Sequence, residues 1–377
     1  MNKNSEELWT LNNLPLTEMM GNYDPNFEGL DQSLMIDSSS AHVYLKNIIP
    51  SDHLYNSTNY SYRTGSSTKT RGTINRFLDF FNKTTLGKKV ESIVDVGGND
   101  LTLDKFLKPH AKNCYVIDPV CSKDDGKSIE DIHVIGRKIE EVNLKDIDPN
   151  TITCRHTIEH IENPKEFISQ LFDQCADDCT YVFEIPDFDC LVESMRFDAV
   201  FHQHLHYFSL DTLSNLITEC GGEVIDHEYN FQGSCGGALF IAFQKTNRKI
   251  HPIFINIEDR KDYLEKKISH FQTHMNELSD QIEEIPKPIY GYGAGLMLAT
   301  YAYHLKTDFS FMETILDDDP DKHGIGYINL PVKISHPSKV DIPDNSSYII
   351  TSLENIRPIY NRLQEFLPRR ILAPFIS

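Results

Sequence analysis

Apolar and polar positions alternate in short blocks through the middle of the chain. Between residues 74 and 246, apolar runs of strand length are separated by stretches with helical spacing. The runs expected to form strands are VESIVDVG, NCYVID, NTITCRHT, CTYVFEIP and GGALFIAF. Because strands that alternate with helices build βαβ units, this pattern predicts an α/β domain with a mainly parallel sheet.

The two flanks have different patterns. Residues 1–73 are rich in Asn, Ser and Tyr and show little periodicity, which predicts a small irregular N-terminal lobe. In IEDRKDYLEKKISHFQTHMNELSDQIEEIPKP the apolar residues are alternately four and three apart, which predicts a helix closed by Pro286. It would pack on its own chain or form a dimer coil. IYGYGAG, FMETILDDDP and SYIITSL are expected strands, so residues 247–377 are assigned to a linker helix and a second, C-terminal α/β domain.

Bulk composition narrows the functional classes. A formal net charge of -20 opposes binding to nucleic acid or to an anionic membrane, because the field of the protein repels phosphates. The N-terminus has neither the basic nor the apolar region of a signal peptide, and the apolar runs are too short to span a bilayer. We therefore expect a soluble cytoplasmic protein, monomer or homodimer. The eight cysteines include no CxxC pair, which indicates reduced, mostly buried thiols.

A glycine turn suggests a cofactor site. VDVGGND follows an apolar strand and precedes LTLDKFLK, and the strand NCYVID ends in Asp118, where an acid can bind both hydroxyls of a ribose. The dinucleotide fingerprint G-x-G-x-x-G is incomplete, which disfavours NAD. Asp95 can receive the amino group of a methionine moiety, so S-adenosylmethionine is the expected cofactor. The residues expected to bind it are Asp95, Gly97, Gly98, Asn99 and Asp118.

An ordered set of motifs carries a family resemblance. VDVGGNDLTLDKFL, RHTIEHIENPKEF, FHQHLHYFS, GSCGGALFIAF and YGYGAGLMLATYAY resemble the sugar C-methyltransferases of deoxysugar pathways. The resemblance implies a class I (Rossmann-like) methyltransferase domain, S-adenosylmethionine, and a nucleotide-linked keto-sugar held between the central and C-terminal domains. It also implies a structural zinc bound by four cysteines in the N-terminal lobe. Here Asp37 and Ser40 replace one cysteine pair, so we expect no metal and a lobe held by packing.

A second departure concerns three histidines. The family segment Tyr-His-Glu-His, whose tyrosine, glutamate and second histidine are thought to surround the reacting sugar carbon, is Phe201, His202, Gln203 and His204 here. Loss of a carboxylate and a phenol makes carbon methylation harder and favours O- or N-methylation. With His206, the histidines alternate, so an extended segment would place all three on one face. Three roles are open for these histidines: binding a metal, a purely structural role, and proton transfer centred on His204. The resemblance favours proton transfer.

The other candidates depend on position and resemblance. Arg155 and His156 end a strand at the cofactor edge, and His160 matches an active-site histidine of the family. Beside the base His204, the expected catalytic residues are His160, Gln203 and Tyr207. The expected substrate-binding residues are Tyr60, Tyr62, Ser66, Ser67, His202, Gly236 and Gly237. Arg63, Lys69 and Arg71 would suit a diphosphate or form a solvated loop, and the two glycines would admit substrate or mark a bulge.

These inferences converge on a methyltransferase of nucleotide-linked sugars. C-methylation of a keto-sugar with His204 as general base is the leading hypothesis, with O- or N-methylation of a related acceptor as the alternative. A catalytically decayed homologue is the third reading. YGYGAG followed by Asp317 imitates a dinucleotide fold, but the resemblance implies no second cofactor in that domain.

Overall fold

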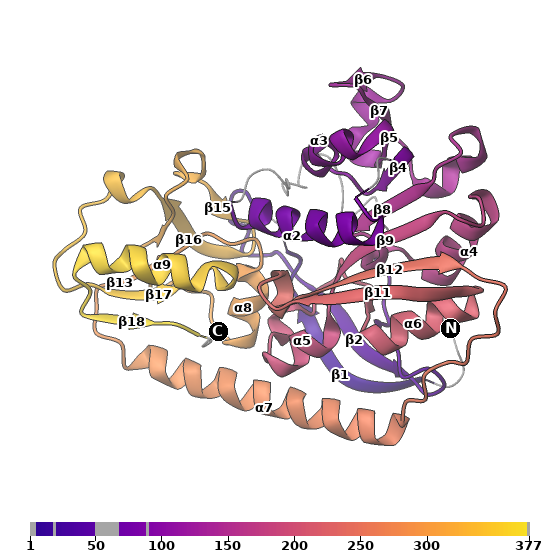
Figure 1. Ribbon diagram of the computed structural model, residues 1–377. Helices are drawn as coiled ribbons and strands as arrows, with labels where there is room; N and C mark the ends of the chain where they lie inside the picture. Colours follow the sequence, from indigo (N-terminus) through magenta and orange to yellow (C-terminus); the bar gives the residue numbers. More distant parts are fainter. Residues whose placement is uncertain (1–4, 18–19, 50–67, 88–89, 375–377) are drawn as a thin grey trace.

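The computed structural model describes residues 5–17, 20–49, 68–87 and 90–374 (Figure 1). Within these residues the chain forms three sheets, of four, eight and six strands. Tyr60, Tyr62, Arg63, Ser66 and Ser67 lie outside the described part, as do the side chains of Lys69 and Arg71.

The eight-stranded sheet forms the centre of the molecule and has the order β11-β12-β9-β8-β4-β5-β7-β6. Its five parallel strands are β4 (Val90–Val96), β5 (Ala111–Ile117), β7 (Ile132–Ile135), β8 (Thr151–Arg155) and β9 (Thr180–Pro186). The antiparallel strands are β6 (Ser128–Ile129) at one edge, and β11 (Gly222–Asn230) at the other edge with β12 (Ala238–Lys245) beside it. The expected α/β domain with a mainly parallel sheet is confirmed.

Helices cover both faces of this sheet, which is why its strands are almost continuously apolar. On one face α2 (Thr68–Thr84) and α3 (Thr102–Leu107) pack through Phe77, Phe80 and Leu103. On the other, α4 (Pro164–Gln174) and α6 (Leu210–Glu219) pack through residues such as Phe167 and Leu213. Parallel strands end at a common edge, and the turns at their carboxyl ends gather the candidate site.

The N-terminal lobe is a regular sheet, so the expectation of an irregular lobe was wrong. β1 (Ser5–Leu14), β2 (Leu30–Asp37) and β3 (Val43–Leu45) pair antiparallel in sequence order. Alternate residues such as Leu34, Ile36 and Val43 point into the core. The fourth strand, β10 (His206–Tyr207), comes from the central part of the chain and pairs with β3. Because β3 and β10 are far apart in the sequence, local periodicity cannot reveal that they pair in one sheet.

A long helix leads to the C-terminal part of the chain. α7 (Ile257–Glu283) lies along the base of the molecule (Figure 1), as the sequence predicts, and its apolar seam packs on its own chain. The six-stranded sheet has the order β15-β16-β14-β13-β17-β18. Its strands are β13 (Ile289–Tyr292), β14 (Ile315–Leu316), β15 (Gly326–Tyr327), β16 (Leu330–Ser335), β17 (Ser347–Ile350) and β18 (Arg370–Leu372). α8 (Leu298–His304) and α9 (Ile356–Leu363) complete this second α/β unit; the domain boundaries remain predictions.

An aromatic stack and a buried ion-pair network help to join these parts. Trp9 of β1 stacks on His304 of α8 with ring centroids 5.4 Å apart, and Phe271 of α7 meets the same imidazole edge-on at 4.9 Å. Arg196 donates to both oxygens of the buried Asp198, at 2.8 and 3.0 Å, and to Glu354 of the C-terminal unit at 2.9 Å. No described helix is both long and apolar enough to cross a bilayer.

Candidate active site

The glycine turn after β4 is a close crossing of backbone segments. Gly97 has a φ of +82°, and a Cβ at this position would lie 2.0 Å from Thr157 Oγ1. At Gly98 a Cβ would lie 2.2 Å from the Val116 side chain. Both positions therefore require glycine, because a side chain would displace the turn from the β8 and β5 segments.

Buried acids surround this turn. Thr153 Oγ1 donates to Asp95 Oδ1 at 2.5 Å, and burial raises the Asp95 pKa to about 7, with the Asp118 carboxylate acting in the same direction. Asp118 accepts the backbone N–H groups of Asn99 and Val120, each at 2.8 Å. Asp104 of α3, which was not predicted from the sequence, is fully buried, and neither of its carboxylate oxygens accepts a hydrogen bond from the residues that the structure describes.

The acids make the turn suited to a cationic ligand. Burial raises the Asp104 pKa well above its ordinary value, and the neighbouring Asp95 raises it further. A positive group placed here would stabilise the ionised carboxylates and lower both pKa values. S-adenosylmethionine carries an ammonium and a sulfonium and therefore fits the charge of the site. When bound, it would supply an electrophilic methyl group, and the expected binding of its ammonium by Asp95 and of its ribose by Asp118 stays a prediction.

Arg155 and His156 form a buried ion-pair network at the end of β8. Arg155 pairs with Glu184 and lies over the Phe77 ring at 5.2 Å, and His156 Nε2 is 3.2 Å from the same carboxylate. Burial by itself would lower the His156 pKa, but the charge of Glu184 and contact with Glu159 raise it to about 9. These contacts give both residues a structural role beside the turn, and their expected contact with the cofactor stays a prediction.

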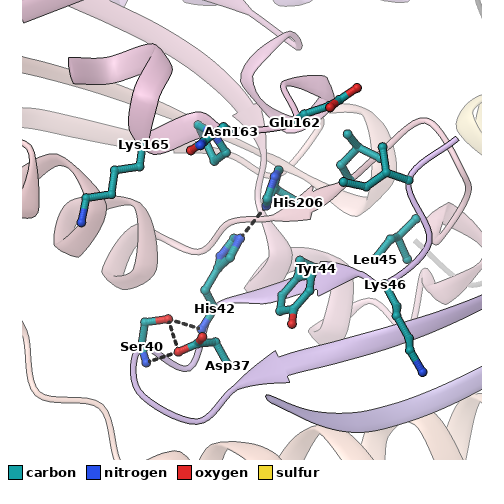
Figure 2. A pocket seen from close by; sticks show the side chains of 13 residues that line it. Asp37, Ser40, His42, Tyr44, Leu45, Lys46, Glu162, Asn163, Lys165 and His206 are labelled. Atoms are coloured by element: carbon teal, nitrogen blue, oxygen red, sulfur yellow. Dashed lines mark hydrogen bonds between the residues drawn. The ribbon is translucent and has the colours of Figure 1, made fainter. Parts of the chain in front are cut away.

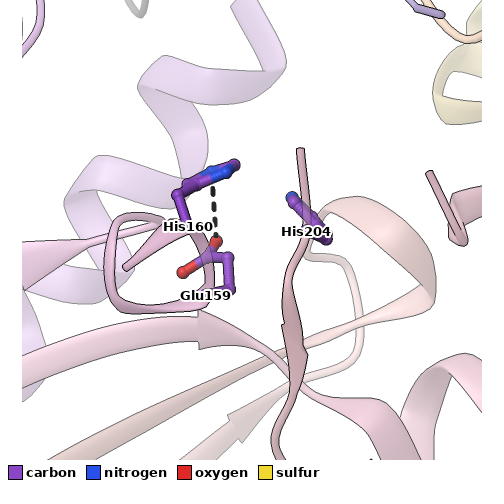
Figure 3. A group of neighbouring side chains, drawn as sticks. All are labelled: Glu159, His160 and His204. Atoms are coloured by element: carbon purple, nitrogen blue, oxygen red, sulfur yellow. Dashed lines mark ion pairs between the residues drawn. The ribbon is translucent and has the colours of Figure 1, made fainter. Parts of the chain in front are cut away.

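His160 and His204 lie together, as Figure 3 shows, with ring centroids 4.9 Å apart. Glu159, which was not predicted from the sequence, lies beside them, below His160 in the figure, and its Oε1 is 3.9 Å from His160 Nε2. Burial alone would raise the Glu159 pKa, but the neighbouring imidazoles lower it. Burial lowers the His204 pKa to about 3, and the adjacent His160 contributes in the same direction. His204 is therefore neutral, with a ring nitrogen available as an acceptor.

The three alternating histidines do not share a face, so that expectation was wrong. The chain turns at His202 and Gln203, and only His206 and Tyr207 are in a strand. His202 is fully buried and bonds the Leu14 carbonyl at 3.0 Å through Nε2, which favours a structural role over substrate contact. His206 pairs with His42 of the N-terminal lobe at 2.9 Å. Of the three histidines, His204 is the one that lies beside Glu159 and His160.

The residues beside His204 position it. Phe201 packs on the His204 imidazole with ring centroids 4.2 Å apart. The Gln203 carbonyl is 2.7 Å from His160 Nδ1, and its side-chain oxygen accepts from Thr17 at 2.9 Å. Tyr207 accepts the Phe201 backbone N–H at 3.2 Å through its hydroxyl, and burial raises the Tyr207 pKa.

The space around Gly236 and Gly237 is filled by neighbouring residues of the same chain. A Cβ at Gly236 would lie 2.4 Å from Ser194 Oγ, and one at Gly237 would lie 2.7 Å from Cys190 Cβ. These neighbours belong to or follow α5 (Phe188–Glu193). The geometry favours close packing over admission of a substrate.

A pocket of about 420 Å³ lies between the N-terminal lobe and the start of α4 (Figure 2). The paired His42 and His206 form part of its wall, together with Lys46 and Lys165. Burial lowers the His206 pKa to about 4. None of the residues that surround the cofactor turn lines this pocket.

Asp37 stands where the family resemblance expects a zinc-binding thiolate. Its Oδ1 accepts the backbone N–H groups of Ser39 and Ser40, each at 2.9 Å, and the hydroxyls of both serines. A carboxylate thus organises the turn between β2 and β3 through hydrogen bonds, in addition to the packing expected from the sequence. Absence of zinc stays a prediction.

Residues of the same chain fill the space beside the glycine turn that follows β13. A Cβ at Gly293 would lie 2.5 Å from Ser352 Cβ. Asp317 Oδ2 accepts from the Ala294 backbone N–H at 2.8 Å and from Lys322 at 3.1 Å. These bonds explain the dinucleotide-like pattern as a structural turn, and the expectation of no second cofactor stays a prediction.

Comparisons with known proteins bear on the central domain. Residues 67–227 match a family described as a methyltransferase domain. No curated protein gives a significant match. Similar solved structures include the N-methyltransferase NodS from Bradyrhizobium japonicum WM9, at 16% identity over 49% of this chain and 91% of that chain, with a TM-score of 0.37. Another is the 1,6-didemethyltoxoflavin-N1-methyltransferase of Burkholderia thailandensis, at 12% identity over 61% and 100%, with a TM-score of 0.42.

At these scores the likeness to solved structures bears on neither acceptor nor reaction. The family match includes the strands β4 to β9 of the central sheet and the glycine turn with its acids. This chain accordingly contains a methyltransferase domain of the class I, Rossmann-like fold, and the protein is a methyltransferase.

Proposed function

We propose that this enzyme methylates a nucleotide-linked keto-sugar on carbon, with His204 as the general base. The observation that carries the proposal is the segment that follows β8. Thr157 of this segment contacts the cofactor turn at Gly97, and Glu159 and His160 lie beside His204. One short segment thereby connects the methyl donor site to the imidazole, which supports an acceptor atom between the two.

The expected reaction needs a proton acceptor close to the acceptor carbon. Neutral His204 removes a proton from the carbon next to the ketone, and the electron pair forms an enolate. That carbon attacks the methyl group of the sulfonium, the S–CH3 bond breaks, and S-adenosylhomocysteine leaves. Positioning the two carbons in line contributes much of the rate, because it removes the entropy cost of their encounter.

Glu159 supplies a carboxylate near the base, although Gln203 has none to offer. Both Glu159 and His204 are buried, at 1% and 6% exposure, so their interaction is weakly screened. An ionised carboxylate stabilises the imidazolium that forms when His204 accepts a proton. Glu159 therefore acts against the loss that the segment from Phe201 to His204 implies, but burial outweighs this charge and holds the His204 pKa at about 3.

The acceptor class depends on the sequence resemblance. The contact between Glu354 and Cys235, where the Cys235 backbone N–H donates at 3.1 Å, supports it by joining the central and C-terminal units. O- or N-methylation of a related sugar is a second candidate, because the apolar Phe201 ring against His204 offers no hydrogen bond to an enolate oxygen.

Two measurements test the proposal. Calorimetric titration should show binding of S-adenosylmethionine, and mass spectrometry of products from a panel of nucleotide-linked keto-sugars should show addition of one methyl group. Deuterium at the carbon next to the ketone should be lost on C-methylation and kept on O- or N-methylation. Retention of the label in a methylated product would exclude the carbon reaction.

A substitution tests the base. His204→Ala should bind S-adenosylmethionine as the wild type does and lose about 100-fold or more of turnover, the usual contribution of a general base. The matched control is His227→Ala, which removes an exposed histidine on β11. Unchanged turnover in His204→Ala would remove this residue from the mechanism.

A further inference from the structure

Glu159, His160 and His204 bring a carboxylate and two imidazoles to one point, and we refer to them as the Glu-His-His cluster. One ligand atom from each residue lies within 4.8 Å of those of the other two. The first two come from the turn after β8, and His204 comes from the segment before β10 (Figure 3). Two separate segments of the chain therefore bring their ligand atoms together.

The orientation of His160 is the first observation that points to a cation. Its Nδ1 lies 2.7 Å from the Gln203 carbonyl oxygen, which can only accept, so Nδ1 carries a proton. In the neutral ring, Nε2 is then the nitrogen that can bind a cation, and it lies 3.9 Å from Glu159 Oε1. Histidine ligands of metals commonly hold their other N–H on a backbone carbonyl in this way.

The state of Glu159 is an independent observation. Its carboxylate is buried, and neither oxygen accepts a hydrogen bond from the described residues. His156 Nδ1 makes an ion-pair contact with Oε1 at 3.6 Å, which is too long for a hydrogen bond, and the other nitrogen of that ring is held by Glu184. Buried carboxylates are usually hydrogen-bonded or coordinate a metal, because desolvation of the free ion is costly.

We propose that the Glu-His-His cluster binds one divalent transition-metal ion of the zinc class. Two imidazole nitrogens and one carboxylate oxygen are a ligand set of catalytic zinc sites, which keep the fourth position open. Nitrogen ligands disfavour magnesium and calcium. Bonds of about 2.0–2.2 Å in a tetrahedron separate ligands by about 3.4 Å, so the side chains close by about 1 Å on binding.

This inference goes beyond the proposed function and does not depend on the acceptor. A ring nitrogen cannot hold a proton and a metal at once, so the metal-loaded protein presents an ion where the metal-free protein presents the His204 base. An open coordination position would suit a hydroxyl or carbonyl oxygen, which the ion would polarise. The ligand class of the loaded site is therefore an oxygen-bearing acceptor.

Metal binding can be measured on the full chain without substrate. After treatment with a chelator and its removal, the wild type should bind one zinc ion at this site by calorimetry. Glu159→Gln should weaken this binding by about 100-fold or more, since removal even of an outer hydrogen-bond partner costs 10- to 100-fold. Cobalt(II) provides a spectroscopic readout: the visible bands of a tetrahedral ion should appear in the wild type and be absent from the variant.

Matched controls separate this site from other ligands. Glu162→Gln removes an exposed carboxylate three residues away and should leave zinc binding unchanged. His160→Asn is the second variant, because its amide can still donate to the Gln203 carbonyl, and it should bind zinc as weakly as Glu159→Gln. Circular dichroism and titration with S-adenosylmethionine check that both variants are folded.

Two outcomes would overturn the metal site: a wild type that binds no zinc, or zinc that binds Glu159→Gln and His160→Asn as tightly as wild type. The second outcome would assign the ion to another site, such as the His42–His206 pair. Loss of turnover in His204→Ala together with either outcome would leave the proposed function standing. Zinc binding that depends on the cluster, without turnover on any sugar, would support the metal site and contradict the proposed function.

Discussion

His304 offers a direct test of how tightly the lobe, the long helix and the C-terminal unit are joined. Its imidazole lies between Trp9 and Phe271 and is 8% exposed. Burial lowers the His304 pKa to about 3. The perturbation is His304→Phe, which keeps an aromatic ring in the stack and removes the titrating group.

The sign of the effect follows from linkage. The folded pKa lies below the unfolded value of about 6.5, so stabilisation by neutral His304 is complete above pH 6.5 and is lost as the pH falls toward 3. At pH 5.5 the unfolded chain gains about 1.4 kcal/mol from protonation, which the folded chain cannot match. The wild type should therefore lose about 1.4 kcal/mol more than His304→Phe between pH 8.0 and 5.5.

The chain contains one tryptophan, Trp9, so its fluorescence reports this junction directly. Urea unfolding at pH 8.0 and 5.5 gives the free energy of unfolding of each protein, and the pH dependence of the difference is the quantity of interest. Other buried histidines titrate in both proteins and cancel. His227→Phe, at an exposed position, should keep the wild-type pH dependence within about 0.5 kcal/mol. Equal pH dependence in wild type and His304→Phe would refute burial of a neutral imidazole at this junction.

Two further predictions concern the cofactor turn and the domain contact. Gly97→Ala should weaken S-adenosylmethionine binding at least about tenfold by calorimetry, because the added Cβ would lie 2.0 Å from Thr157 Oγ1. The control is Gly126→Ala, which has a similar φ of +77° and open space around it, and which should bind the cofactor as the wild type does. Equal affinities of the two variants would contradict the crowding at Gly97. Arg196→Met should destabilise the fold by about 3–5 kcal/mol, measured by chemical denaturation, because it leaves Asp198 buried and unpaired. Adding Asp198→Asn should recover part of that loss, and a single variant as stable as the wild type would show that the pair is dispensable.

The sequence predicts the central and C-terminal folds well, because their strands are apolar runs separated by helical spacing. It fails for the N-terminal lobe, where Leu34 and Ile36 alternate correctly but the sheet is completed by β10. It also fails at His202, since nothing local marks the turn there. Buried contacts with Leu14 and His42 draw His202 and His206 toward the lobe, and these depend on tertiary structure.

The cofactor turn follows from local sequence, while its supporting acids do not. Gly97 and Asp118 stand at the ends of recognisable strands, so their proximity could be foreseen. Asp104 carried a weak signal, a charge among the apolar positions of LTLDKFL, where Leu103 and Leu107 are buried. Glu159 had none beyond its place next to His160, because its approach to His204 depends on how two distant segments cross.

The pairing of β3 with β10 has a consequence for synthesis on the ribosome. The first three strands emerge about 160 residues before the strand that completes their sheet. Until then β3 presents unpaired backbone groups, which are open to association with other nascent chains. Growth of the polypeptide past Tyr207 is therefore the earliest moment at which the beginning of the protein can close its own sheet edge, and helper proteins that shield exposed strands would act within that interval.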